Sequence, residues 1–67
     1  YDDVVIRGNP ADRSFSCLYL RDGHLIAVDA INAPRDFVQA KPLIAARALL
    51  RSEQLADAET ALKDLAA

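Results

Sequence analysis

Two residue types that commonly take part in chemistry occur once each in this 67-residue sequence, as His24 and Cys17. His24 follows Asp22 and Gly23 in a predicted turn, and a metal site needs several ligands of this kind together. His24 is therefore interpreted as a solvated turn residue. Cys17 lies within an apolar run and has no histidine placed beside it, so we expect a core thiol rather than a nucleophile.

Asp29 is the third candidate, because it is an acidic residue inside a predicted strand. It could bond a neighbouring backbone or domain, or it could mark the point where the sheet meets water. The structural role is favoured, since no second acid is placed to form a general acid–base pair with it. The two glycines, Gly8 and Gly23, do not form a phosphate-binding loop. The residues alone predict no catalytic constellation, metal site or cofactor loop.

The composition is that of one small folded domain over residues 1–67. Apolar residues make up 52% of the chain and charged residues 27%, which is typical of a globular sequence. The net charge of −2 gives no broad basic field for nucleic acid. No apolar run approaches the length of a membrane-spanning helix, about 20 residues, and no signal peptide opens the chain. A lone cysteine indicates a reducing compartment, so we expect the cytoplasm.

The first half of the chain predicts a small antiparallel sheet of three strands. Val4–Ile6 is β-branched throughout, and two further apolar runs, Phe15–Leu20 and Leu25–Ile31, flank the Asp22–Gly23 pair. An Asp-Gly pair favours a type I′ turn, which predicts a central hairpin over residues 14–31.

The same turn predicts how the hairpin strands pair. Three of the expected pairs are Tyr19 with Ile26, Cys17 with Val28, and Ser16 with Asp29. One face, with Phe15, Cys17 and Tyr19, would then be wholly apolar and form the core. The other face would be apolar over half of its length, so we expect something to cover it as well.

The second half of the chain predicts helix. Pro34 suits the first helical turn, and apolar residues follow at helical spacing, namely Phe37, Ala40, Ile44 and Ala48. Pro42 removes one main-chain hydrogen bond, so we expect one kinked helix. A short turn around Leu55 and a last helical turn over 61–65 complete the chain. The expected fold class is α+β, a three-stranded antiparallel sheet followed by a kinked helix and a short C-terminal helical segment.

Short motifs along nearly the whole chain occur in an ordered set. They are Tyr1-Asp2, Val4-Val5-Ile6-Arg7-Gly8, Ser14-Phe15-Ser16, Tyr19-Leu20, Arg21-Asp22-Gly23, Ile26-Ala27-Val28-Asp29-Ala30, Asn32-Ala33-Pro34-Arg35-Asp36-Phe37, Leu43-Ile44, Leu55-Ala56-Asp57 and Leu62-Lys63-Asp64-Leu65. This ordered set resembles the C-terminal domain of FAD-dependent NAD(P)H:ferredoxin and rubredoxin reductases, which feed electrons to cytochrome monooxygenases and aromatic-ring dioxygenases.

The resemblance implies a larger flavoprotein in which two upstream Rossmann-like domains hold FAD and NAD(P)H. Residues 1–67 would be an N-terminally truncated C-terminal domain that is not catalytic alone and binds no cofactor or metal by itself. Its implied role is to pack against the flavin domain. A partner domain, or the surroundings of a strand that precedes Tyr1 in the family, would cover the second sheet face. It would also form part of the surface that receives a two-iron two-sulfur ferredoxin or a rubredoxin.

One residue carries over from the family as a docking candidate. Lys63 matches a basic position on the side of the domain where an acidic ferredoxin would approach, and such charges steer weak redox partners. A solvated terminal lysine is the alternative interpretation. Pro42 departs from the polar or basic residue that is usual in the family, which leaves the local helix geometry open.

A second hypothesis needs no parent flavoprotein. The chain could be a free-standing interaction module that forms a homodimer through its sheet, because an unpaired edge strand recruits other chains. A third class, a small metal- or thiol-based enzyme, is disfavoured because the chain has one histidine and one cysteine.

Overall fold

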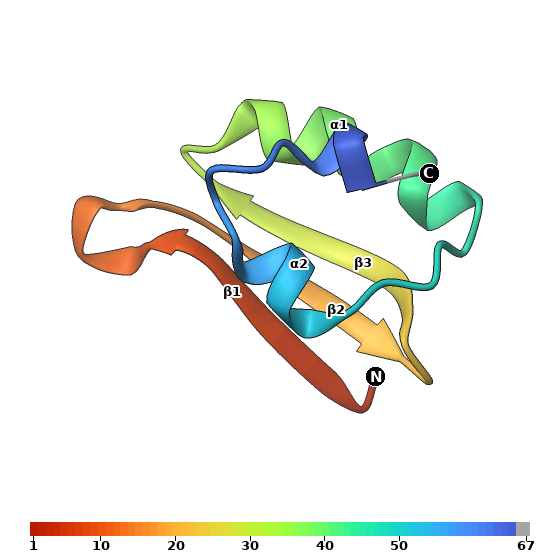
Figure 1. Cartoon of the computed structure of the whole chain (residues 1–67). Coiled ribbons are helices and arrows are strands. Elements are labelled where there is room, and N and C mark those ends of the chain that lie inside the picture. The colour runs from red at the N-terminus through yellow and green to blue at the C-terminus, as the bar shows by residue number, and fades with distance from the viewer. Residues whose placement is uncertain (66–67) are drawn as a thin grey trace.

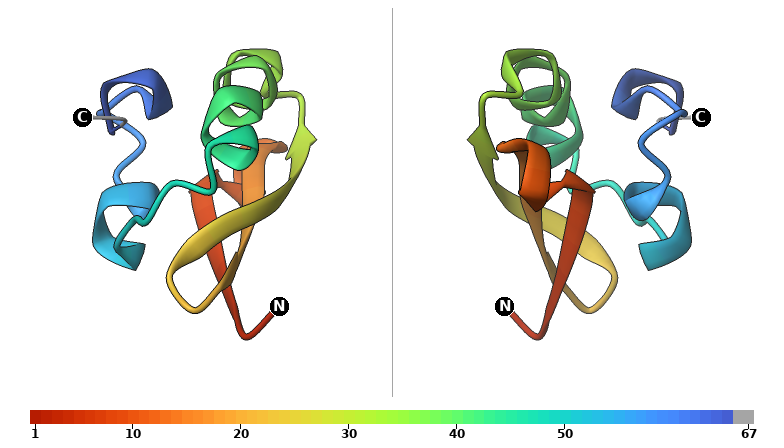
Figure 2. Two further views of the ribbon diagram at one scale, coloured as in Figure 1. Left: turned by 90° about the vertical axis from the view of Figure 1, so that its right-hand side faces the viewer. Right: turned by 90° about the vertical axis from the view of Figure 1, so that its left-hand side faces the viewer.

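A sheet and a layer of helices make up the computed structural model, which describes residues 1–65 (Figure 1). The elements in chain order are β1 (Asp3–Asn9), η1 (Pro10–Asp12), β2 (Ser14–Arg21), β3 (His24–Ile31), α1 (Pro34–Ala45), α2 (Ser52–Ala56) and η2 (Leu62–Leu65). The strands pair antiparallel in the order β1-β2-β3, and the helices lie on one side of them (Figure 2). The expected α+β fold and the hairpin over 14–31 are confirmed.

The hairpin turn has the backbone conformation that its sequence predicts. Asp22 has φ 52° and Gly23 has φ 81°, and a type I′ turn requires positive φ at both central positions. Gly23 is also in close contact with the segment after α1, because a Cβ atom at Gly23 would lie 2.8 Å from Cδ1 of Leu49. The Asp-Gly signal therefore gives the right turn at the right place.

The pairing beyond the turn differs from the expected one, because β3 contains a bulge. Leu20 pairs with Leu25 as expected, but Tyr19 pairs with Ala27, so that Ile26 is the extra residue. Every later pair is displaced by one position, as in Leu18 with Val28, Cys17 with Asp29, and Ser16 with Ala30. Because side chains alternate between faces, this one-residue shift moves all later residues of β3 to the opposite face.

The helices of this chain cover the half-apolar face, which another part of the protein was expected to cover, and they leave open the wholly apolar face, which was expected to form the core. Leu18 and Leu20 are buried beneath the helices, whereas Cys17 is only half-buried and lies on the opposite face. The expectation of a core thiol was wrong. Without the bulge, Asp29 would share a face with the fully buried Leu25 and bring a carboxylate under the helices, which is costly. The bulge keeps Leu25 inside and turns Asp29 outward.

The core is built from all parts of the chain. Its buried apolar side chains are Val5, Leu18, Leu20, Leu25, Ala40, Leu43, Leu50, Leu55 and Leu62. The expected stripe of α1 was wrong at Phe37, which is 43% exposed and lies beneath the Lys41 ammonium, 4.6 Å from it. Asp36 faces the sheet, where it bonds Arg7 and Ser16. Because the next residue of a helix points about 100° away, Phe37 lies at the edge of the face that α1 turns to the sheet.

A single helix runs through Pro42, as expected, and it ends in a Schellman motif. The N–H of Ala48 donates to the carbonyl of Leu43 over 2.9 Å, and the N–H of Arg47 donates to that of Ile44 over 3.1 Å. Arg47 has φ 50°, the left-handed conformation that this motif requires. The chain then passes the hairpin tip, where the N–H of Leu50 donates to the carbonyl of Gly23 over 2.9 Å.

One charged residue, Arg7, lies in the interior between the two layers. Its side chain is 3% exposed, and its Nε donates to Asp36 Oδ1 on α1 over 3.3 Å. Its Nη1 donates to the carbonyl oxygens of Leu55 over 3.2 Å and of Asp57 over 2.7 Å, and its Nη2 donates to that of Thr60. Arg7 therefore links the sheet to α1 and to the segment after α2.

The anionic partner of Arg7 is itself held by the sheet. Ser16, which is buried and pairs with Arg7 across the strands, donates its hydroxyl to Asp36 Oδ2 over 2.8 Å. Among the described residues, no buried side-chain nitrogen or oxygen lacks a hydrogen-bond partner. Buried charges are tolerated when all their polar atoms are paired in this way.

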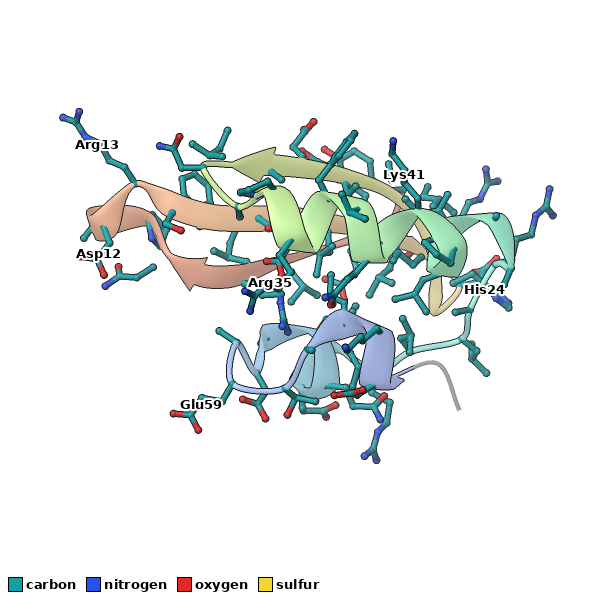
Figure 3. The ribbon with its side chains drawn as sticks, turned by 90° about the horizontal axis from the view of Figure 1, so that it is seen from above. Asp12, Arg13, His24, Arg35, Lys41 and Glu59 are labelled. Carbon is teal, nitrogen blue, oxygen red and sulfur yellow. The ribbon has the colours of Figure 1, made fainter. Side chains whose placement is uncertain are left out.

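We expect Arg7→Met to destabilise the fold by about 3 kcal/mol or more, because it leaves the Asp36 carboxylate and three carbonyls without their donor. Urea unfolding followed by circular dichroism measures the change. Arg13→Met is the control, since Arg13 is exposed on the β1–β2 connection and points into solvent (Figure 3), so the effect should stay within about 0.5 kcal/mol. Equal midpoints for the two variants would contradict the role of Arg7.

Candidate docking surface

The face of the sheet that the helices do not cover is the candidate docking surface, and we call it the outer face. It consists of three cross-strand rows, which are Val4–Tyr19–Ala27, Ile6–Cys17–Asp29 and Gly8–Phe15–Ile31. The strand residues that alternate with these rows direct their side chains to the helices, and the apolar ones among them belong to the core. The outer face is thus positioned by the pleat of the sheet and by the bulge in β3.

Each of the three rows of the outer face carries one exposed apolar side chain. Val4 is 40% exposed, Ile6 44% and Ile31 44%. Tyr1, which precedes β1, is 72% exposed, and its ring centroid lies 4.8 Å from that of Tyr19. A contiguous apolar surface rimmed by polar residues marks a site of interaction with another protein surface.

A single charged side chain, Asp29, lies in the three rows of the outer face. The Tyr19 hydroxyl donates to its Oδ2 over 2.7 Å. This hydrogen bond to Asp29, with partial burial and the carboxylate's charge adding to it, raises the pKa of Tyr19 from 10.0 to about 12. The folded state therefore favours the protonated phenol. The bond contributes to stability below about pH 10, and the contribution is lost as the pH rises to about 12.

Lys63, the docking residue predicted from the family, does not lie on the outer face. It is an exposed residue of η2, and its main-chain N–H donates to Gln39 Oε1 of α1 over 3.2 Å. The helices and η2 lie on the other side of the sheet (Figure 2). The structure thus separates Lys63 from the apolar outer face, and its docking role stays a prediction.

His24 lies at the tip of the hairpin as expected, but it is the first residue of β3 and half-buried rather than a fully solvated turn residue. Its Nδ1 lies 2.7 Å from the main-chain oxygen of Arg47, so it connects the tip to the end of α1. Within residues 1–65, no three His, Cys, Asp or Glu side chains come together as a metal site. In the same part of the chain, no helix is long and apolar enough to cross a lipid bilayer.

Two polar arrangements escaped the sequence analysis. Arg7 directly follows the β-branched run Val4–Ile6, so its place in a predicted strand could have raised the question of which groups it bonds. A buried arginine needs such partners. The Tyr19–Asp29 pair could not have been found, since the two residues become neighbours on one face only through the bulge. The sequence did single out Asp29 as a residue able to bond a neighbouring group.

We expect Asp29→Asn to bring the pKa of Tyr19 from about 12 down towards 10.0, because it removes the carboxylate that holds the phenolic proton. Titration of phenolate absorbance measures the change. The chain has two tyrosines, so both versions should carry Tyr1→Phe, which leaves Tyr19 as the single chromophore of this kind. An unchanged titration curve would mean that Asp29 does not hold the proton.

Known proteins resemble this chain over 75 to 100% of its length. A ferredoxin reductase subunit of 5,5'-dehydrodivanillate O-demethylase from Sphingobium sp. is 46% identical over 67 residues, which is 100% of this chain and 16% of that protein. A ferredoxin–NAD(P)+ reductase from Sphingomonas sp. is 50% identical over 50 residues, 75% of this chain and 12% of that protein. Putidaredoxin reductase from Pseudomonas putida is 36% identical over 67 residues, 100% of this chain and 16% of that protein.

The chain therefore spans only 12 to 16% of the length of these relatives. Its whole sequence nevertheless agrees with one family description, Reductase C-terminal, whose model matches residues 1–66. This match, together with the full-length identities, shows that the chain belongs to the reductase C-terminal family.

Proposed function

We propose that residues 1–67 form the C-terminal domain of an FAD-dependent NAD(P)H:ferredoxin or rubredoxin reductase that supplies electrons to an oxygenase system. The family match over residues 1–66 carries the proposal. The names of the relatives add to it, since one is the ferredoxin reductase component of a chlorobenzene dioxygenase and another is a putidaredoxin reductase. In such a parent protein the upstream domains hold FAD and NAD(P)H, and electron transfer takes place there.

The domain would serve as an interface and would not catalyse a reaction alone. Its outer face, which is apolar and open, would pack against the flavin domain. Its opposite side carries the helices and the exposed Lys63, and it would stay accessible to an acidic ferredoxin or rubredoxin. One side of the sheet would thus contact the flavin domain and the other side would contact the ferredoxin or rubredoxin. The free cysteine agrees with a reducing compartment, and we place the protein in the cytoplasm.

A dimer of the isolated domain is the second candidate, and the edge of β1 favours it. β1 pairs with β2 on one side only, and an unpaired strand edge can add a strand from another chain. Sedimentation of the 67-residue chain over a range of concentrations tests this candidate, which predicts a growing dimer fraction. A monomer at every concentration would contradict it.

We expect the longer protein that contains this chain to be yellow with bound flavin and to reduce a ferredoxin at the expense of a pyridine nucleotide. The physical reason is that the parent, unlike residues 1–67, would carry the nucleotide-binding domains. The flavin absorbance of the purified protein and the rate of ferredoxin reduction measure the two properties. A colourless and inactive parent protein would contradict the proposed function.

We expect Lys63→Glu in that protein to raise the KM for ferredoxin by up to about fivefold at low salt, since an exposed charge pair contributes less than about 1 kcal/mol. The salt dependence of KM should also become weaker, because fewer opposite charges are screened. Steady-state kinetics at several salt concentrations measure both effects. Arg13→Glu makes the same charge change on the β1–β2 connection and is the control. Equal KM values for wild type and Lys63→Glu would remove Lys63 from the docking surface.

A further inference from the structure

The charged residue in the middle of the apolar outer face limits what can cover that face. Asp29 lies in the central one of the three rows, beside Cys17 and Ile6. Tyr19 donates to Oδ2 of Asp29, and no donor among residues 1–65 bonds Oδ1. In the free domain Asp29 is exposed, so water can bond this second oxygen.

A surface that closed over the outer face would remove that water. A carboxylate that loses water without gaining a partner is destabilising, and the phenol of Tyr19 bonds only one of its two oxygens. A purely apolar surface would therefore be a poor match. A surface with a basic side chain opposite Asp29 would match both the apolar rows and the carboxylate, because charged groups in an interface are retained when they are paired.

The start of the chain indicates where that surface comes from. The Tyr1 ring packs against Tyr19 on the outer face, so residues that precede it in a longer protein join the chain at the rim of this face. The relatives that match the full chain are much longer, and the chain makes up 16% of each. In a protein that ends with this domain, as the family description Reductase C-terminal indicates, the preceding part would be both large enough and close enough to cover the outer face.

We propose that the part of the reductase polypeptide before Tyr1 covers the outer face and places an arginine or lysine side chain against Oδ1 of Asp29. This inference rests on the proposed function, since it presumes the longer protein. Asp29 then acts as the polar contact that sets the orientation of the two domains, and the apolar rows around it exclude water from the ion pair.

Cys17 provides a native reporter for this contact, because it is half-buried and adjoins Asp29 in the same row. Trypsin cleaves after Arg13 and Arg21, so Cys17 is contained in the peptide of residues 14–21. A pulse of iodoacetamide on the full-length native protein, followed by mass spectrometry of this peptide, gives the alkylation rate of Cys17. The rate in the urea-unfolded protein is the reference.

We expect Cys17 of the native full-length protein to react at least about tenfold more slowly than in the unfolded protein, because the preceding domain covers it. The expected rate does not depend on protein concentration. Equal rates in the native and unfolded protein would mean that the outer face is open. Protection that grows with concentration would mean that a second copy covers the face. Either result would overturn the proposal.

The sign of the effect of Asp29→Leu tests the basic partner. Both proteins compared, with aspartate and with leucine at this position, carry Tyr19→Phe, so that no hydroxyl loses its acceptor. Opposite a basic side chain, leucine leaves a buried charge unpaired, so the contact should open and Cys17 should react about tenfold faster than with Asp29 in place. Opposite an apolar surface, leucine would tighten the contact and slow the reaction. An unchanged or slower reaction would overturn the proposal.

Two further variants separate this effect from others. Asp29→Asn removes the same charge from the neighbourhood of the thiol but keeps an acceptor oxygen for the basic side chain, so the protection of Cys17 should fall between those measured with Asp29 in place and with Asp29→Leu. Glu59→Leu removes an exposed acid from the loop between α2 and η2 (Figure 3) and should leave the rate unchanged. A yellow, active protein with an unprotected Cys17 would contradict this inference alone, whereas a colourless protein with a protected Cys17 would contradict the proposed reductase alone.

Discussion

The arrangement of the two layers depends on the hydrogen bonds and the ion pair that the buried guanidinium of Arg7 forms. The sheet, α1 and the segment after α2 meet at this one side chain, through Asp36 and three main-chain oxygens. A chain of this size has a small core, and its last segment contains only a five-residue helix and a 3-10 turn. Apolar contacts at Leu55 and Leu62 hold this segment against the core, and Arg7 fixes its position along β1.

The bulge in β3 decides which chemistry each face of the sheet presents. On the inner face, the charge of Arg7 is paired with Asp36 within the domain. On the outer face, the carboxylate of Asp29 has one oxygen bonded by Tyr19. The half-buried Phe15 and Tyr19 and the exposed Ile31 lie on the outer face, where no helix covers them. A local insertion of one residue, Ile26, therefore separates the surface that closes the domain from the surface that is left for another part of the protein.

The local elements could be predicted from the sequence because their signals are local. The Asp22–Gly23 turn, the helix after Ala33 and the final helical turn each follow from a few neighbouring residues. The faces of the hairpin could not be predicted, since Leu25–Ile31 is apolar at every position but one and so has no alternation to fix the register. The partners of Arg7 could not be predicted either, because its carbonyl acceptors lie 48 to 53 positions further along the chain and are features of the backbone.

Because Arg7 bonds main-chain oxygens, the segment after α2 should tolerate substitutions better than insertions or deletions. Every residue type carries a carbonyl oxygen, so the bonds from Arg7 to residues 57 and 60 do not require the aspartate and threonine that stand there. An insertion or deletion between these positions would move the oxygens away from the guanidinium, whatever residues were involved. The length of this short stretch should therefore be more constrained than most of its side chains, with the exception of Asp57, whose carboxylate accepts from the Glu59 N–H and the Thr60 hydroxyl.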